Sequence, residues 1–133
     1  MHRCSVLIVD DDAELREMVR VALTADSYRT AAAANGREAL DYLRSTTDTC
    51  VILLNLMMPV MDGAQFRAAQ LRDRSLAWIP VVVISGTVDG GQQARTLGIR
   101  FERKPIDLDQ LRQTLQHIGC VRSLPRRQDS VSR

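Results

Sequence analysis

Two kinds of apolar pattern alternate along this chain, and their alternation restricts the possible folds more than any other feature of the sequence. Continuous runs of Val, Ile and Leu occupy residues 6–9, 51–54 and 81–84, which is typical of strands buried on both faces. Weaker strands are expected at residues 28–34, where alanines are poor strand formers, and at residues 100–103. Between these runs, apolar residues recur every three or four positions, which indicates helices that bury one face.

Helix-start signals stand after several of the strands. Asp12 is expected to cap a first helix, and Asp62 is expected to open a third one. Asn35 is followed three residues later by Glu38, which is the spacing of a capping box, and Asp107 has Gln110 at the same position. The apolar face predicted for the first helix consists of Leu15, Met18, Val19, Ala22 and Leu23. The third helix carries Phe66, Ala69 and Leu71, and the last carries Leu108, Leu111, Leu115 and Ile118.

The helix expected near residues 88–97 is the least favoured of the five. Gly90 and Gly91 fall in its first turn, and each glycine costs about 1 kcal/mol relative to alanine in a helix. The helix also has few large apolar residues with which to pack against a sheet. We therefore expect the segment after Ser85 to be the most mobile regular part of the chain.

Five strands that alternate with five helices predict an α/β protein with a parallel sheet. Right-handed crossovers place helices on both faces, and five strands suit the flavodoxin-like doubly wound order 2-1-3-4-5. The 133 residues are enough for one domain, which we expect over residues 1–120. In residues 121–133, four arginines and one aspartate give a net charge of +3, and the apolar pattern has stopped, which predicts a disordered basic C-terminal tail.

Composition argues against several classes of protein. No apolar run approaches the roughly 20 residues of a membrane-spanning helix, and no signal-peptide core follows Met1, so we expect a cytoplasmic protein. Three cysteines at irregular spacing argue against a disulfide framework and against a zinc site. Aromatic residues make up only 4% of the chain, which argues against a base-stacking surface. We expect neither direct nucleic-acid binding nor membrane binding.

Polar residues follow the predicted strands at their carboxyl ends, which is where doubly wound sheets bind ligands. Asp10 and Asp11 follow the first strand, Asn55 the third and Ser85 the fourth. Lys104 follows the fifth strand and is the one lysine among 18 basic residues. Two carboxylates facing an amide oxygen suit a hard cation such as Mg²⁺. A lysine and a hydroxyl beside that cation suit the oxygens of a phosphoryl group.

Four segments together carry a resemblance to a known family. They are residues 6–12, 55–63, 83–86 and 104–105, which read VLIVDDD, NLMMPVMDG, VISG and KP. In this order and spacing, the chain resembles the receiver domains of two-component response regulators over nearly its whole length. In that family, an aspartate at the end of the third strand accepts a phosphoryl group from a histidine kinase or a phosphotransfer protein.

The resemblance implies a role for each residue of the predicted site. Residues matching Asp10 and Asp11 hold Mg²⁺, together with residue 55 and the backbone carbonyl of Met57. The partner that reads the switch would be an output protein bound to the surface formed by the fourth helix, the fifth strand and the fifth helix. The phosphoryl-binding and switch positions implied by the resemblance are Ser85, Lys104 and Phe101, and the Lys104–Pro105 bond is implied to be cis.

Asn55 stands where the family has its phosphoacceptor aspartate. A carboxamide is neutral and its oxygen is a far weaker nucleophile than a carboxylate oxygen, so we expect no acyl phosphate at residue 55. The lost charge also weakens Mg²⁺ binding, although an amide oxygen can still ligate the ion. Because Asp10, Asp11, Ser85 and Lys104 are all present, Asn55 is either an engineered phospho-null substitution or a natural feature of a receiver that uses its pocket differently.

Three functions are compatible with these residues. The leading one is a single-domain receiver acting as a phosphorylation-controlled protein-interaction switch, which is phospho-null while Asn55 is present. The second is a phosphorylation-independent interaction module whose partner recognises the resting surface. The third is a metal-dependent phosphatase with Asp10 as nucleophile and Asp12 as acid/base. That class needs a further acidic pair on a later strand, where this chain has Ser85 and Gly86, so we predict that the protein is not an enzyme.

Overall fold

The strands form one sheet that is covered by helices on both faces. The computed structural model describes residues 5–87 and 89–119, so the tail predicted at residues 121–133 lies outside the described residues. The strands are β1 (Ser5–Val9), β2 (Arg29–Ala33), β3 (Thr49–Leu54), β4 (Val81–Ser85) and β5 (Arg100–Arg103). The helices are α1 (Ala13–Ala25), α2 (Gly36–Arg44), α3 (Gly63–Arg72), α4 (Gly90–Leu97) and α5 (Leu108–Ile118).

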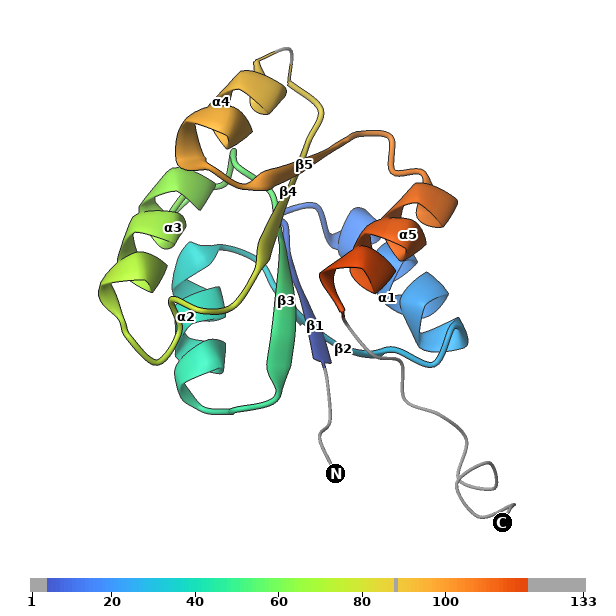
Figure 1. Cartoon of the computed structure of the whole chain (residues 1–133), viewed down its shortest axis with the longest axis horizontal. Helices are drawn as coiled ribbons and strands as arrows, with labels where there is room; N and C mark the ends of the chain where they lie inside the picture. Colours follow the sequence, from blue (N-terminus) through green and yellow to red (C-terminus); the bar gives the residue numbers. More distant parts are fainter. Residues whose placement is uncertain (1–4, 88, 120–133) are drawn as a thin grey trace.

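The strand order is β2-β1-β3-β4-β5, and every neighbouring pair is parallel. This confirms the flavodoxin-like, doubly wound order expected from the sequence. Helices α1 and α5 cover one face of the sheet, and α2, α3 and α4 lie on the other (Figure 1). Because all strands are parallel, the carboxyl ends of β1, β3, β4 and β5 lie along one edge.

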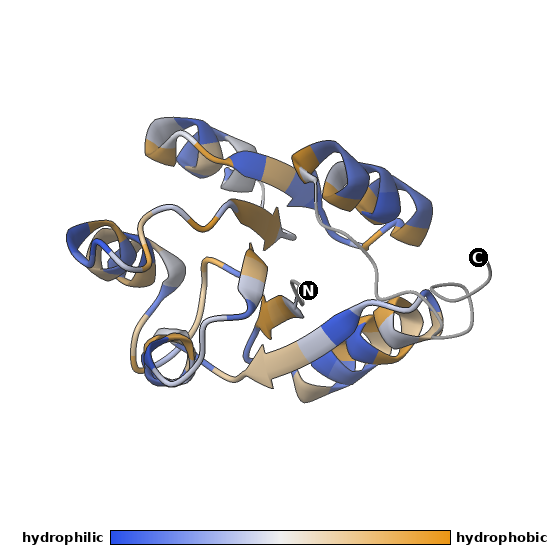
Figure 2. Cartoon of the chain, turned by 60° about the horizontal axis from the view of Figure 1, so that its bottom comes forward, coloured by the Kyte–Doolittle hydropathy of each residue, from blue (hydrophilic) through white to orange (hydrophobic). Residues whose placement is uncertain are grey.

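The core has two sides because successive residues of a strand point to opposite faces. Val6 and Ile8 of β1 belong to a buried cluster that includes residues of α1 and α5. Leu7 and Val9 belong to a second cluster that includes residues of α2 and α3. The continuous apolar runs of β1, β3 and β4 are therefore buried on both faces, and their hydrophobic colour in Figure 2 contrasts with the mixed colours of the helices.

Side-chain caps begin four of the five helices, at the residues with which the sequence predicts that α1, α2, α3 and α5 open. Asp12 accepts hydrogen bonds from the amides of Glu14 and Leu15, and Asp107 caps α5 in the same way. Asn35 accepts from Glu38, whose carboxylate in turn accepts from the Ala34 amide rather than from Asn35. In α3, Asp62 and Gln65 form a complete capping box. None of the helices within the described ranges is long and apolar enough to cross a membrane.

Two apolar residues lie outside the core although helical spacing placed them on apolar faces. Met18 is 46% exposed, whereas its neighbour Val19 is buried. Adjacent helical residues differ by about 100° in direction, so a face centred on Val19 leaves Met18 at its rim. Leu71 is likewise 51% exposed beside a fully buried Gln70. The Gln70 amide is buried because it donates hydrogen bonds to two loop carbonyls.

A β-bulge shapes the start of β3. Its pairing with β1 passes from Ser5–Thr49 to Val6–Val51, so Cys50 is the extra residue. Cys50 packs partly buried against the core on the α1–α5 side, and its sulfur is disulfide-bonded.

We expect the backbone amides of α4 to exchange with solvent about tenfold faster than those of α1, a difference of about 1.4 kcal/mol in local opening. Helix α4 begins at Gly90 and Gly91, and its N-cap residue Asp89 makes no side-chain capping bond. Helix α1 is longer and is capped by Asp12. Amide hydrogen exchange followed by NMR measures both helices in one sample. Equal or greater protection of α4 would contradict the expectation.

Candidate functional site

The five polar residues predicted at the strand ends lie together at the carboxyl edge of the sheet. Asp10 and Asp11 follow β1, Asn55 follows β3, Ser85 ends β4 and Lys104 follows β5. Backbone hydrogen bonds fix the edge: the Asn55 amide donates to the Val9 carbonyl at 2.9 Å, and the Lys104 amide donates to the Ser85 carbonyl at 3.0 Å. The side chains are therefore positioned by the sheet itself rather than by flexible loops.

Asp10 is the buried anion of the site, with 3% of its surface exposed. One carboxylate oxygen accepts a hydrogen bond from the Asp12 amide at 2.9 Å. The other forms an ion pair with the Lys104 ammonium at 3.0 Å. The sequence predicts Lys104 beside this acidic pair, and the Lys104–Pro105 bond that follows it is cis, as the resemblance implied. Both oxygens of Asp10 are thus partnered within the protein.

Asn55 links the other groups of the pocket through its amide nitrogen. The side-chain NH₂ donates to a carboxylate oxygen of Asp11 at 3.2 Å and to the backbone carbonyl of Met57 at 2.9 Å. Asn55 is buried, with 7% exposure, whereas Asp11 is exposed. We expected the oxygen of this amide to face the acidic residues, and the structure turns the nitrogen towards them instead. The reason is that an amide NH₂ has two protons to place, and two acceptors lie within reach.

The arrangement does not fit a divalent cation as it stands. A hard cation such as Mg²⁺ takes oxygen ligands, and Asp11 and the Met57 carbonyl supply them. Both oxygens accept hydrogen bonds from the Asn55 side chain, so the amide NH₂ fills the position between them. A cation there would require the amide to turn by half a rotation and present its oxygen. Within the described residues, no three His, Cys, Asp or Glu side chains are grouped as metal ligands.

Ser85 is also partnered inside the pocket. Its side chain is buried, with 1% exposure. The hydroxyl shares a hydrogen bond with the Thr87 hydroxyl at 2.9 Å and accepts one from the Thr87 amide at 3.2 Å. Thr87 was not among the residues predicted from the sequence, although a hydroxyl two positions after Ser85 is a signal that could have suggested it. The Ser85 hydroxyl is therefore drawn towards the loop that leads to α4.

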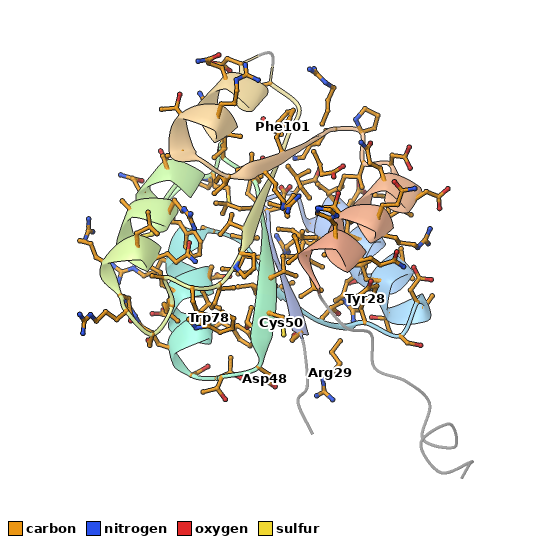
Figure 3. All side chains as sticks on the ribbon, in the orientation of Figure 1. Tyr28, Arg29, Asp48, Cys50, Trp78 and Phe101 are labelled. Carbon is orange, nitrogen blue, oxygen red and sulfur yellow. The ribbon has the colours of Figure 1, made fainter. Side chains whose placement is uncertain are left out.

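Gly90 brings the start of α4 against the pocket. A Cβ at residue 90 would lie 2.6 Å from the Ser85 hydroxyl and 3.2 Å from Cε1 of Phe101, so only glycine leaves room for both side chains. The half-buried Phe101 ring lies on β5 beneath α4 (Figure 3). Ser85 and Phe101, the residue that the resemblance implies as the aromatic switch, thus both lie against the first turn of α4.

Comparison with known proteins agrees with this fold and site. A family model described as the response regulator receiver domain matches residues 6–116. The chain is 35% identical over 132 residues to response regulator Rre1 of Synechocystis sp., covering 96% of this chain and 54% of that protein. It is 29% identical over 113 residues to sporulation initiation phosphotransferase F of Bacillus subtilis, covering 84% and 90% of the two chains. The chain thus spans about half the length of the first of these relatives.

Solved structures give the same result. Chemotaxis protein CheY4 of Vibrio cholerae superposes with a TM-score of 0.78 at 29% identity, covering 87% of this chain and 98% of that one. The bacteriophytochrome response regulator AtBRR superposes with a TM-score of 0.79 at 28% identity, covering 94% and 98%. The chain belongs to the response regulator receiver family and provides a receiver domain of two-component signalling.

Proposed function

We propose that this receiver acts as a protein-interaction module that stays in its resting conformation, because its pocket neither accepts a phosphoryl group nor depends on a divalent cation. One observation carries the proposal: the Asn55 amide donates to both Asp11 and the Met57 carbonyl. Receiver domains in general bind Mg²⁺ at their acidic site and are in general not enzymes. Here an amide NH₂ holds together the oxygens that a cation would otherwise join.

The chemistry of residue 55 supports the phospho-null half of this proposal. An amide oxygen carries no full negative charge, and its lone pairs are delocalised towards nitrogen, so it attacks phosphorus poorly. The amide also faces its neighbours with its donor side. Lys104, which would neutralise a phosphoryl oxygen, is already paired with Asp10. No group in the pocket is left poised for group transfer.

The same contacts support the resting conformation. A ligand shifts a conformational equilibrium only by binding one state more tightly than the other. Without an acyl phosphate, Lys104 keeps its ion pair with Asp10, and Ser85 keeps its hydrogen bond with Thr87. The surface of α4, β5 and α5 therefore stays in one form for an output protein, and a histidine kinase or phosphotransfer protein can dock without transferring phosphate. We assign this module to residues 1–120.

Beryllofluoride with Mg²⁺ tests the proposal, because this phosphoryl mimic binds an acceptor carboxylate. In ¹H–¹⁵N NMR spectra, we expect the amides of Ser85, Thr87 and Phe101 to shift in the Asn55→Asp variant and to stay in place in the chain itself. Asn55→Ala is the control for loss of the side chain and should not respond either. A full response in the chain itself would overturn the proposal, since anion binding would then not need the carboxylate.

A further inference from the structure

A second surface lies at the opposite end of the sheet from Asn55. It surrounds the loop of residues 73–79, which joins α3 to β4, and it includes the C-terminal ends of α2 and α3. We call it the Trp78 surface and define it by Arg44, Arg72, Arg74 and Trp78. In Figure 3, Phe101 lies near the top of the molecule and Trp78 lies well away from it, at the lower left. The surface is therefore separate from both the pocket and the face formed by α4, β5 and α5.

The loop that carries Trp78 is held rigidly. The fully buried Gln70 amide donates to the carbonyls of Leu76 and Ile79, both at 3.0 Å. The Asp73 carboxylate accepts from the Ser75 amide at 3.0 Å and from its hydroxyl at 2.7 Å. Leu76 and Ile79 are anchored in the core. A rigid loop loses little conformational entropy when a partner binds.

Trp78 projects from this loop into solvent. It is the only tryptophan of the chain, and 60% of its surface is exposed. Its indole N–H donates to the Ser75 carbonyl at 2.9 Å, which fixes the ring without burying it. The fold gains little from a large aromatic surface in this position. Tryptophan and arginine are, with tyrosine, the residue types enriched among the energetic centres of protein interfaces.

A hollow of about 260 Å³ lies beside Trp78 and is lined mainly by the loop and by residues of α2 and β3. Leu43, Leu76 and Ile79 give it an apolar side. Thr49 lines it as well, at the bulge of β3, and the buried Thr49 hydroxyl has no hydrogen-bond partner among the described residues. The hollow therefore offers an apolar wall to an entering side chain.

A wider hollow of about 460 Å³ shares Arg44 with the first and is lined by Ala69, Arg72, Asp73 and Arg74. Asp73 pairs with Arg44 at 3.4 Å, and hydrogen bonds from Ser75 hold the pKa of Asp73 below its usual value. Arg72 and Arg74 form no ion pair within the described residues, so the hollow is net positive. Asp48 also lies at this end of the molecule, where it accepts a hydrogen bond from Thr46 (Figure 3).

A helix dipole explains only part of this charge. Arg44 and Arg72 stand in the last turns of α2 and α3, where basic side chains stabilise the carbonyl end of a helix. Arg74 lies beyond the end of α3, and the dipole does not account for Trp78 either. Guanidinium groups bind carboxylates in a bidentate manner. An apolar hollow beside a net positive one is thus complementary to an acidic chain that carries an apolar side chain.

We propose that the Trp78 surface docks an acidic protein segment, whose apolar side chain enters the hollow beside Trp78 while its carboxylates pair with Arg72 and Arg74. The surface lies away from Asn55, so this docking does not require phosphorylation. It gives the receiver a binding site that is additional to the one proposed for α4, β5 and α5.

A labelled peptide tests the docking site. The probe is a fluorescein-labelled peptide with one Leu flanked by Glu residues. Its fluorescence anisotropy is followed as the protein is added. In a second titration, an unlabelled copy of the peptide is added to the protein up to millimolar concentration, and the emission of Trp78 is followed. We expect saturable binding that changes the Trp78 emission. A peptide with every Glu replaced by Gln should bind at least about tenfold more weakly, because its neutral amides cannot form the bidentate, charge-assisted pairs that carboxylates form with guanidinium groups.

Matched variants locate the site. Arg72→Glu combined with Arg74→Glu should abolish detectable binding, and Trp78→Ala should weaken it. Arg95→Glu combined with Arg100→Glu changes the net charge equally on another face of exposed arginines, and it should leave binding unchanged. Thermal unfolding of each variant checks that it folds. Absence of binding, equal loss in both double variants, or equally tight binding of single-stranded DNA would overturn the proposal.

Discussion

The Asn55→Asp variant should accept one phosphoryl group from acetyl phosphate in the presence of Mg²⁺, and the chain as it stands should accept none. The substitution replaces an amide by an anionic oxygen nucleophile at the end of β3. The rest of the pocket is already in place, because Asp10, Ser85 and Lys104 lie at the same edge of the sheet. The expected difference is therefore the appearance of a reaction rather than a change in its rate.

Intact-mass spectrometry at neutral pH measures the added phosphoryl group, and treatment with hydroxylamine identifies it as an acyl phosphate. The double variant Asn55→Asp with Lys104→Ala is the matched control. It keeps the carboxylate but lacks the ammonium that would neutralise the transferred group, so we expect much slower phosphorylation. Stoichiometric phosphorylation of the unsubstituted chain, or an inert Asn55→Asp variant, would show that residue 55 does not decide the chemistry.

The sequence predicted the order of the elements because strands buried on both faces need continuous apolar runs and the helices need one apolar face. It also placed the candidate site residues at one edge of the sheet, since the strand order brings the carboxyl ends of β1, β3, β4 and β5 together. Caps were predicted where the donor and acceptor are three residues apart, as at Asn35. These features depend on short-range spacing or on topology, and both can be read from a single chain.

Other features depend on contacts that spacing does not contain. The orientation of the Asn55 amide is decided by two acceptors, one of them 44 residues away in Asp11. Gln70 is buried because loop carbonyls of Leu76 and Ile79 need a donor, and no periodicity of polar residues signals that need. The Trp78 surface arises where the ends of α2 and α3 meet the β4 loop, so its arginines become neighbours only after folding.

Magnesium should bind the Asn55→Asp variant about 100-fold more tightly than the chain itself. In the chain, cation binding requires the Asn55 amide to give up its bonds to Asp11 and to the Met57 carbonyl. A neutral hydrogen bond contributes about 1 kcal/mol and one to a charged group about 1.5–3 kcal/mol, so the cost is about 3 kcal/mol. A cost of that size corresponds to about two orders of magnitude in affinity. Isothermal titration calorimetry of both proteins gives the ratio.

The stability of the Asn55→Asp variant should depend strongly on Mg²⁺, whereas the stability of the unsubstituted chain should hardly depend on it. Without the cation, Asn55→Asp loses both amide donors and places a third carboxylate beside Asp10 and Asp11. Repulsion between two charges about 4 Å apart is on the order of 4 kcal/mol at an effective dielectric constant near 20, so the variant should be less stable than the chain by about 2–4 kcal/mol.

Saturating Mg²⁺ should restore most of this loss through its preferential binding to the folded variant. The unsubstituted chain should unfold at nearly the same temperature with and without the cation, because its amide already joins the oxygens that Mg²⁺ would ligate. Equal affinities, or a chain that gains as much stability from Mg²⁺ as the variant does, would show that the Asn55 amide does not replace the cation.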